Sequence, residues 1–460
     1  MIRFYNTLTK RKEEFKPLEE GTVKLYTCGP TVYDLAHIGN FRAYAFEDLL
    51  HRYLEYSGYK VIRVMNITDV DDKTIKGAQR EGINLREYTD RYISAFLKDM
   101  ETLRLKKPDY LPRATDHIPE MVSLIKKLLD KGYAYYKDGS IYFSIAKFPS
   151  YGTLAGIDIS EIKPGARVDV DEYEKEDVRD FALWKEEKEG VFWDTEIGRG
   201  RPGWHIECSA MSMKYLGESF DIHTGGVDNI FPHHENEIAQ SEAATGKKFV
   251  NYWLHWAHLL VNNEKMSKSK GNFYTLRDIL NKGYNPVAIR YLLLSTHYRD
   301  PLNFTERSLV QAENTIKNYN AFYQALDFCK GDKTNKDIKD AIVKARDGFT
   351  GGLDDDLNIS LALSEVFNLM KKVNTYITDG SLSLVDALYI KNFLEEIDSI
   401  LVILDKEKIE LTEQEKALVK EREEARRAKN FQKADELREI LKTKGIILED
   451  TPYGTRWKRL

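Results

Sequence analysis

Cysteine is scarce in this chain, which has only 3 cysteines among its 460 residues. Cys28, Cys208 and Cys329 are too few and too widely spaced to predict a disulfide framework. Buried packing, metal binding and nucleophilic catalysis remain as roles for these thiols.

Long apolar runs are also missing. No stretch reaches the roughly 20 consecutive apolar residues that a membrane-spanning helix needs. The segment 1–15 mixes Lys, Arg and Glu and contains no apolar stretch, so it does not resemble a signal peptide. We therefore expect a cytoplasmic protein with no membrane partner.

The chain contains 69 Lys and Arg residues and 74 Asp and Glu residues, so no large excess of one charge identifies a partner. The net charge of −5 is weak evidence against nucleic-acid binding, because phosphate contacts depend on local basic patches. The length predicts two to four domains, and internal repeats and low-complexity tracts are absent from the sequence.

The N-terminal part of the sequence alternates between strand and helix patterns. Residues 23–27 and 59–66 are β-rich, and 38–56 between them has a helical pattern. A strand, a crossover helix and a strand at this spacing predict a βαβ unit in a parallel sheet. The expected fold class is α/β, with a doubly wound, Rossmann-type nucleotide-binding domain.

Residues 115–203 interrupt this alternation. A helical pattern at 118–130 precedes a hairpin at 133–143, whose Asp138-Gly139 pair is a strong turn signal. Charged, irregular sequence follows. We interpret the segment as an insertion into the sheet domain.

Afterwards the alternation resumes, with helices predicted at 204–216 and 232–244 and strands at 219–224 and 253–261. Beyond about residue 306, helical spacing dominates and predicts a bundle, followed by a small mixed C-terminal module. The predicted domains are a catalytic domain (1–114 and 204–248), an inserted connective domain (115–203), a segment with a lysine-rich loop (249–305), a helical bundle (306–401) and a C-terminal module (402–460).

Two short motifs suggest nucleotide chemistry. Residues 36–40 (AHIGN) lie where a strand meets a helix, whose free N–H groups attract phosphate. His37 can bind phosphate and Gly39 allows close approach, although an ordinary turn with a capping histidine is the favoured interpretation of these five residues alone. Residues 265–271 (KMSKSKG) suit a mobile cationic loop for polyphosphate, or else a solvated basic loop, and no Walker sequence occurs in the chain.

Together the two motifs resemble those of class I aminoacyl-tRNA synthetases. In that family the first motif usually ends in histidine, where this chain has Asn40, which keeps a neutral donor but cannot take a proton. The second motif, with Lys265 and Lys268, matches in full.

A possible metal site combines histidine, glutamate and cysteine. His233 and Glu237, four residues apart on a helix, share a face, whereas His234 pairs with Ile238, which cannot ligate. Without further ligands, a partly exposed polar pair is the simpler interpretation, and the zincin spacing H-E-x-x-H is absent at His234.

The cysteines are candidates for the missing ligands. Cys28 falls at the carboxyl end of the first strand, where doubly wound folds bind ligands. Cys208 falls in the first turns of a helix, where the dipole lowers a thiol pKa. Burial as two small hydrophobic residues is the alternative, and spacing does not decide between them.

Five segments resemble cysteinyl-tRNA synthetases from one end of the chain to the other: 26–33 (YTCGPTVY), 66–72 (NITDVDD), 200–211 (GRPGWHIECSAM), 220–240 and 448–457 (LEDTPYGTRW). The resemblance implies one zinc ion per subunit, held by Cys28, Cys208, His233 and Glu237. It also implies that this ion binds the substrate thiol and so separates cysteine from serine.

The resemblance further implies activation of L-cysteine with Mg-ATP to cysteinyl-adenylate, and its transfer to the 3′ end of tRNA(Cys). The implied catalytic and ATP-binding residues are His37, Gly39, Asn40, Lys265 and Lys268. The implied substrate-binding residues are Gly29, Thr68, Trp204, His223 and Asp228. We expect the chain to act as a monomer.

The bundle is then expected to bind tRNA and residues 402–460 to read the anticodon GCA. Arginine reads guanine edges, acids accept from cytosine N4, and aromatic rings stack on splayed bases. The anticodon candidates are Arg426, Phe431, Asp435, Asp450 and Trp457. Rival readings are a cysteine ligase acting on an aminosugar, which should lack this module, and a non-catalytic RNA-binding paralogue.

Overall fold

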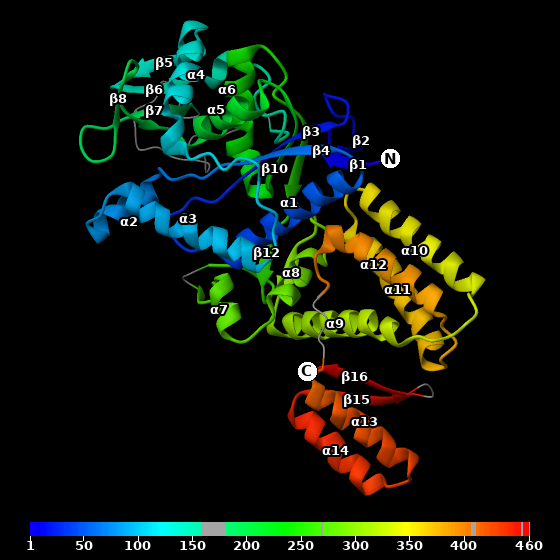
Figure 1. The fold of residues 1–460 in the computed structure, drawn as a ribbon. Helices are drawn as coiled ribbons and strands as arrows, with labels where there is room; N and C mark the ends of the chain where they lie inside the picture. Colours follow the sequence, from blue (N-terminus) through cyan, green and yellow to red (C-terminus); the bar gives the residue numbers. More distant parts are fainter. Residues whose placement is uncertain (158–179, 268–269, 406–410, 452–453, 460) are drawn as a thin grey trace. The chain divides into compact units, whose positions relative to one another are not determined.

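The computed structural model describes residues 1–157, 180–267, 270–405, 411–451 and 454–459 (Figure 1). The chain divides into two compact units. Unit 1 comprises residues 1–306 with 353–358, and unit 2 comprises 307–352 with 359–460. Among the described residues, no helix is both long and apolar enough to cross a bilayer.

The centre of unit 1 is a four-stranded parallel sheet in the order β11-β10-β3-β4. Its strands are β3 (Thr22–Thr27), β4 (Lys60–Met65), β10 (Phe220–Gly226) and β11 (Val250–Trp256). The chain reverses its direction of travel across the sheet between β3 and β10, which is the switch point where doubly wound folds bind ligands. The predicted Rossmann-type sheet is confirmed.

The first helix against this sheet begins at a well-defined cap. α1 (Ile38–Tyr56) starts with a capping box between His37 and Asn40, and its buried face includes Phe41, Leu50 and Leu54. α5 (Trp204–Leu216) and α6 (Glu235–Thr245) follow the insertion and β10, respectively. Predicted and observed bounds agree for α1 and α5.

The helix predicted at 232–244 begins later than expected. Residues Ile230–His234 form a separate wide turn in which Phe231 has extended backbone angles, and α6 proper begins at Glu235. His233 therefore lies just ahead of the helix that carries Glu237.

The insertion contains more regular structure than its sequence suggested. It begins with α4 (Ile118–Asp130) and the predicted hairpin, in which Asp138 and Gly139 both have positive φ. The segment expected to be irregular instead supplies three strands, which complete an antiparallel sheet in the order β5-β6-β7-β9-β8. These strands are β5 (Ala134–Lys137), β6 (Ser140–Phe143), β7 (Phe181–Glu186), β8 (Trp193–Thr195) and β9 (Gly198–Pro202).

The single strand predicted at 253–261 is also wrong. β11 ends at Trp256, and the chain then enters a second sheet, of order β13-β12-β14, through β12 (Leu259–Val261). Asn262 and Asn263, both with positive φ, turn the chain into β13 (Glu264–Lys265), which leads into the lysine loop. β14 is Leu302–Phe304.

The other elements of unit 1 are β1 (Arg3–Asn6), β2 (Arg11–Glu14), α2 (Asp72–Glu81), α3 (Leu85–Thr102), α7 (Leu276–Asn281) and α8 (Pro286–Leu294). α8 packs on α1 through buried ionic contacts, in which Arg290 of α8 pairs with Asp48 of α1.

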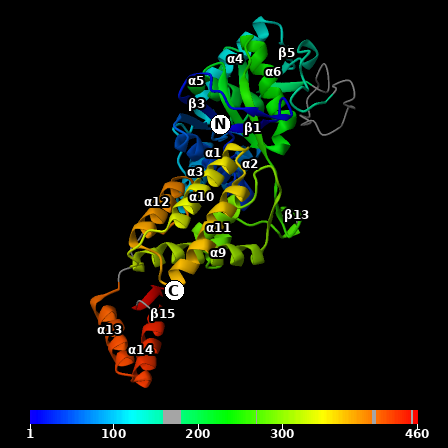
Figure 2. The same ribbon diagram turned by 90° about the vertical axis from the view of Figure 1, so that its right-hand side faces the viewer.

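Unit 2 is mainly helical, and α10, α11 and α12 run side by side (Figures 1 and 2). Arg346 of α10 pairs with Glu396 of α12 at 2.8 Å, which ties two of them together. The helices are α9 (Glu306–Ala325), α10 (Lys336–Asp354), α11 (Ile359–Thr378) and α12 (Leu384–Leu401).

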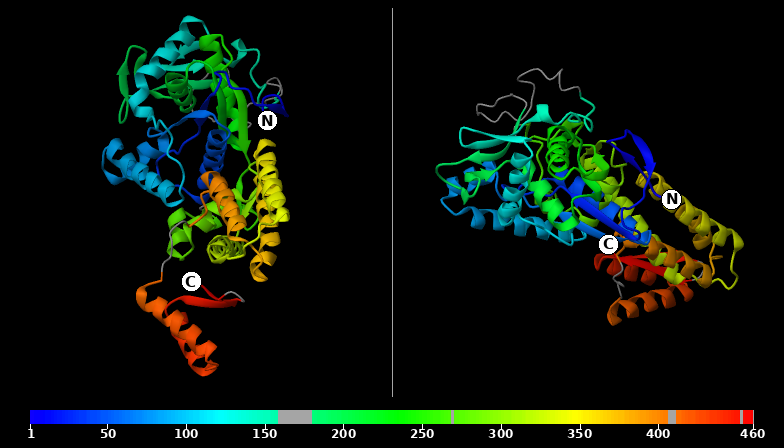
Figure 3. Two further views of the ribbon diagram at one scale, coloured as in Figure 1. Left: turned by 45° about the vertical axis from the view of Figure 1, so that its right-hand side comes forward. Right: turned by 90° about the horizontal axis from the view of Figure 1, so that it is seen from above.

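The last part of unit 2 forms a small helical hairpin beside a β-hairpin, drawn in orange and red in Figure 3. Its elements are α13 (Glu413–Arg427), α14 (Phe431–Thr443), β15 (Ile446–Thr451) and β16 (Gly454–Arg459). Leu411, Leu441, Ile446 and Leu448 form its core.

Candidate active site

A cavity of about 310 Å³ opens at the carboxyl ends of β3 and β10 in unit 1. It brings together residues of both sequence motifs and one of the four predicted metal ligands, Cys28. Its lining includes Cys28, Gly29, His37, Gly39, Asn40, Asp228, Trp256, His258, Lys265 and Met266. The cavity therefore unites segments that lie more than 200 residues apart in the chain.

His37 both caps α1 and faces this cavity. Its Nδ1 accepts a hydrogen bond from the backbone N–H of Asn40 at 3.2 Å, and the Asn40 Oδ1 accepts from the His37 N–H at 3.0 Å. A neutral ring that accepts at Nδ1 carries its proton on Nε2. The capping interpretation and the ligand-binding interpretation thus describe different nitrogens of one ring.

Gly39 lets the lysine loop approach this turn. A Cβ added at Gly39 would lie 3.0 Å from the His37 ring and 3.2 Å from Cε of Met266. The segment after the loop is anchored beside the same turn, because the Ile38 N–H donates to the Tyr274 carbonyl at 2.9 Å. The two motifs are therefore neighbours in space.

The lysine loop presents Lys265 to the cavity as an exposed side chain. Asn272 stabilises the loop's start by accepting from the Ser267 N–H at 2.8 Å, and Lys270 pairs with Glu264 at 2.9 Å. Lys268 lies outside the described residues.

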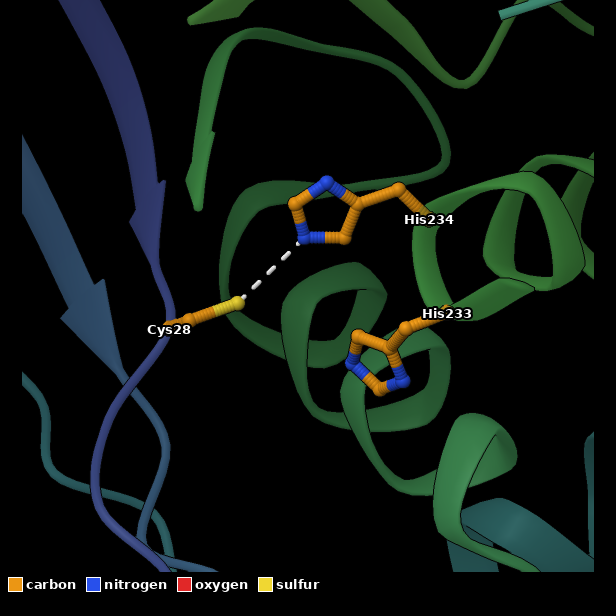
Figure 4. Close-up of side chains that lie close together, drawn as sticks. All are labelled: Cys28, His233 and His234. Carbon is orange, nitrogen blue, oxygen red and sulfur yellow. Dashed lines mark hydrogen bonds between the residues drawn. The ribbon is translucent and has the colours of Figure 1, made fainter. Parts of the chain in front are cut away.

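The candidate metal ligands converge beside the cavity. Their ligand atoms form three overlapping groups, and within each group all lie within 4.8 Å of one another. The groups are Cys28 with His233 and His234, Cys208 with His233 and Glu237, and His223 with His234 and Glu237. Figure 4 shows Cys28 facing His233 and His234 across this space.

The position of the Glu237 carboxylate shows whether these residues suit a metal ion. Its Oε1 lies 3.1 Å from Nε2 of His233 yet is buried with no hydrogen-bond partner among the described residues. Two donors bound to one tetrahedral zinc at about 2.0–2.1 Å lie about 3.3 Å apart. A buried carboxylate oxygen at this separation from an imidazole nitrogen, close to Cys208, fits a shared cation.

His234 is a further candidate ligand, although helical spacing favours His233 and pairs His234 with Ile238, which cannot ligate. Its Nε2 lies 3.4 Å from the Cys28 sulfur and its Nδ1 lies 2.7 Å from Nε2 of His255. Gly225 makes room for it, since a Cβ there would lie 2.2 Å from the His234 ring. Helical spacing could not reveal this residue, because its partners come from distant strands.

Burial dominates the protonation of this cluster. Burial raises the pKa of the Cys28 and Cys208 thiols well above the usual range, and the charge of Glu237 raises both further. The expected lowering of the Cys208 pKa by the helix dipole is therefore wrong. Burial alone would raise the pKa of Glu237, but His223 and His233 lower it to about 2.

The candidate substrate residues separate into two groups. Gly29 and Asp228 line the cavity, and the Asp228 side chain is 62% exposed. Thr68 and His223 are buried beneath it, where Nε2 of His223 lies 3.1 Å from Oε2 of Glu237. Trp204 stacks on His233 with ring centroids 4.2 Å apart, so it lies against the candidate metal ligands and does not line the cavity.

The candidate anticodon residues lie in the small module of unit 2. Phe431 is 61% exposed at the start of α14, which leaves its ring available for stacking. Asp450 forms ion pairs with Arg422 and Arg426. Two of the anticodon candidates, Arg426 and Asp450, are therefore paired with each other. Trp457 packs partly against the core of the module, and Asp435 is exposed.

Comparisons with known proteins agree with this geometry. Residues 14–314 match the catalytic domain of class I (C) tRNA synthetases, 348–405 match a DALR domain, and 409–457 match a cysteinyl-tRNA ligase anticodon binding domain.

The fold is also that of solved synthetases. Methionyl-tRNA synthetase of Mycobacterium tuberculosis, in complex with methionyl-adenylate, aligns with a TM-score of 0.61 and 16% identity, covering 83% of this chain and 90% of that one. The LeuRS of Agrobacterium radiobacter K84, in a ternary complex with tRNA and LeuAMS, aligns with a TM-score of 0.61 and 11% identity, covering 85% of each chain. With the paired motifs in one cavity, this fold defines a class I aminoacyl-tRNA synthetase.

Relatives of the same length identify the family within this class of synthetases. The cysteine–tRNA ligase of Brachyspira hyodysenteriae is 51% identical over 100% of this chain and 99% of its own length. That of Solibacter usitatus is 50% identical over 100% of this chain and 99% of its own. The chain belongs to the cysteine–tRNA ligase family.

Proposed function

We propose that this enzyme activates L-cysteine with ATP in the unit 1 cavity and then transfers it to tRNA(Cys), with a zinc ion selecting the thiol. The observation that carries the proposal is the single cavity lined by Cys28, His37 and Lys265. It joins a metal-ligating thiol to the two motifs expected to handle phosphate.

Zinc would be held by Cys28, Cys208, His233 and Glu237, with His234 as a further donor near Cys28. When bound, it turns a thiol into a thiolate, which a serine hydroxyl cannot imitate because it is far less acidic and a harder donor. Glu237 is the weakest of the four donors for zinc, so we expect it to loosen when the substrate sulfur binds. Shape alone would separate such near-isosteres by only about 1–3 kcal/mol.

The remaining chemistry is positioning and charge stabilisation. The cysteine carboxylate attacks the α-phosphorus of ATP, the bond to the bridging oxygen breaks, and pyrophosphate leaves with Mg²⁺. His37 Nε2–H would donate to the α-phosphate, while Lys265 and Lys268 would neutralise the departing β- and γ-phosphates. Asn40 would donate to the phosphates without exchanging a proton.

Around the amino acid, we assign the ammonium to Asp228 and the pocket wall to Trp204, with Gly29, Thr68 and His223 shaping the base of the pocket. In the second step a hydroxyl of the terminal adenosine attacks the adenylate carbonyl and AMP leaves. We propose that the protein works in the cytoplasm as a monomer, and that the domain limits are those predicted from the sequence.

For tRNA, we propose that residues 306–401 contact the body of the molecule and 402–460 read the anticodon. Phe431 is the best-placed base-stacking residue, because its ring is exposed. The match of 409–457 to an anticodon binding domain supports a tRNA substrate over an aminosugar.

Amino-acid-dependent ATP–pyrophosphate exchange tests this function directly. We expect exchange with cysteine, an efficiency with serine lower by about 10⁴ or more, and one zinc per chain by metal analysis. Chelation should abolish exchange and zinc should restore it. Metal-free protein that is fully active, or equal exchange with serine, would contradict the proposed selection.

A further inference from the structure

The short acidic segment Leu353–Asn358 belongs to unit 1, although the chain on either side of it belongs to unit 2. Asp356, within this segment, is fully buried. Asp356 and Leu357 both have positive φ, at 64° and 53°, a left-handed conformation that costs free energy in residues other than glycine. A turn of this kind persists only where the surrounding structure holds it.

The carboxylate of Asp356 receives hydrogen bonds from three donors. Its Oδ1 accepts from the Tyr298 hydroxyl at 2.6 Å and from the Tyr5 N–H at 2.8 Å. Its Oδ2 accepts from Nε of Arg299 at 2.8 Å, and this guanidinium balances the buried charge. The carboxylate therefore holds the hydroxyl of Tyr298 in one place.

The backbone that carries Tyr298 is fixed as well. Nε2 of His297 donates to the Asp356 carbonyl at 2.9 Å. The buried side chain of Arg42, in α1, donates to the Thr296 carbonyl at 2.8 Å and to the His297 carbonyl at 2.9 Å. Tyr298 is thus held both at its backbone and at the end of its side chain.

Tyr298 reaches the wall of the cavity in two ways. Its carbonyl accepts from the Ala257 N–H at 2.9 Å, and Ala257 lies between Trp256 and His258, which both line the cavity. Its ring stacks on Phe46, with centroids 4.4 Å apart, and the Phe46 ring lies 6.0 Å from that of Trp256. A shift of Tyr298 would therefore displace the wall at two points.

The same stretch of wall leads to the lysine loop. β14, which follows Tyr298 in the chain, pairs in parallel with β12. β12 pairs in turn with β13, which ends at Lys265. Because we assign Lys265 to the departing phosphates, the wall from Trp256 to Lys265 forms the nucleotide side of the cavity.

We propose that Asp356 and Tyr298 are positioning residues that hold the wall from Trp256 to Lys265 in the place that ATP binding requires. The inference rests on the proposed function, because it takes ATP as an occupant of this cavity. Neither residue is among those that line the described cavity, so their effect on ATP passes through Ala257 and Phe46. A misplacement of about 1 Å by a remote residue can cost as much as about 10²-fold.

Cysteine-dependent ATP–pyrophosphate exchange by the full-length protein, with ATP varied at saturating cysteine, tests the inference. Tyr298→Phe removes only the hydroxyl and keeps the ring on Phe46. We expect it to raise the KM for ATP about tenfold while kcat stays within about threefold. Asp356→Gly removes the carboxylate but fits the left-handed backbone, and it should raise the same KM at least as much.

The division of the effect between KM and kcat separates positioning from general damage. A variant that is partly unfolded has fewer active molecules, which lowers the apparent kcat and leaves KM unchanged. Asp356→Asn keeps an oxygen for the Tyr298 hydroxyl and suits the left-handed backbone, so its KM for ATP should stay within about threefold of the wild type. The KM for cysteine should also change by less than about threefold in every variant.

A matched control and a double variant complete the experiment. The neighbouring carboxylate of Asp355 pairs with Lys12 at 2.9 Å and with Arg3 at 3.4 Å, both partly exposed. Asp355→Asn should leave the KM for ATP unchanged. Because Tyr298→Phe and Asp356→Gly break one shared bond, the double variant should resemble Asp356→Gly alone.

Folded Tyr298→Phe and Asp356→Gly variants with a wild-type KM for ATP would overturn the inference, and so would an equal rise in the KM for cysteine. If Asp356→Gly does not fold, Tyr298→Phe carries the test. A wild-type protein without cysteine-dependent exchange would instead overturn the proposed function. Wild-type exchange, measured first, therefore distinguishes the two failures.

Discussion

His37 combines a capping contact with a place at the cavity. Its Nδ1 caps α1 by accepting from the Asn40 N–H, and its ring lines the cavity, where we propose that Nε2–H contacts the substrate phosphate. Asparagine is also a good N-cap residue, since its side-chain oxygen can accept the same bond. His37→Asn therefore removes the longer donor while keeping the cap.

We expect His37→Asn to lower kcat of cysteine-dependent exchange about 10²–10³-fold, the usual cost of one lost donor to developing charge. The free energy of unfolding should change by less than about 1 kcal/mol, because the cap is kept. His37→Ala, which loses both roles, serves as the comparison in urea unfolding. Wild-type exchange by His37→Asn would show that the ring only caps the helix.

At the scale of single residues, the sequence reveals those whose partners are local or whose motif is distinctive. His37 and Lys265 belong to short motifs, and His233 meets Glu237 through helical spacing. His234 could not be predicted in this way, because its contact with Cys28 spans 206 residues. The raised pKa of Cys208 was also beyond reach, since burial and the charge of Glu237 cause it and both depend on the complete fold.

At the scale of elements, bounds are predicted well where a local signal marks the start of a helix, such as a capping box, an early proline or a preceding glycine. The predicted helices at 38–56, 118–130 and 204–216 coincide with α1, α4 and α5. Short strands are different, because their pairing depends on distant partners. Apolar periodicity across 253–261 gives no sign that the chain changes sheets after Trp256. Between 181 and 202, charged residues interrupt the apolar pattern by which strands are predicted.

The packing of α8 on α1 depends on a buried ionic cluster in unit 1. Nη2 of Arg290 lies 2.5 Å from Oδ2 of Asp48, and Nε of Arg52 lies 2.9 Å from the same oxygen. Arg290 also donates to the Leu103 and Arg104 carbonyls at 3.2 Å. Burial alone would raise the pKa of Asp48, but the charges of Arg290 and Arg52 lower it overall.

We expect Arg290→Leu to lower the free energy of unfolding by about 3–5 kcal/mol at pH 7, because it leaves a buried carboxylate underpaired. The folded-state pKa of Asp48 should then rise, so that lowering the pH from 7 to 4 protonates it in the variant while the wild type stays ionised. The stability difference should therefore shrink as the pH falls. Urea unfolding across this range measures it, and a difference independent of pH would contradict the assignment.

At the scale of the whole molecule, activation and tRNA recognition are assigned to different units. Every residue lining the described cavity belongs to unit 1. The module beyond residue 411 has its own core, formed by Leu411, Leu441, Ile446 and Leu448. Because that core draws on no residue of the catalytic unit, the module can be removed without opening a core elsewhere in the described chain.

We therefore expect a chain truncated after Asp405 to keep cysteine-dependent exchange, with KM for cysteine and ATP within about twofold of the full chain. Aminoacylation should show a KM for tRNA(Cys) raised by about tenfold or more, since one lost base-stacking contact alone is worth about 1–3 kcal/mol.

Full-length Phe431→Ala is the matched variant, removing one exposed ring and leaving the module's core intact. This variant should also raise the KM for tRNA(Cys), while cysteine-dependent exchange is unaffected. Loss of exchange on truncation would mean that the module supports the catalytic unit, whereas unchanged aminoacylation would remove the anticodon role from 402–460.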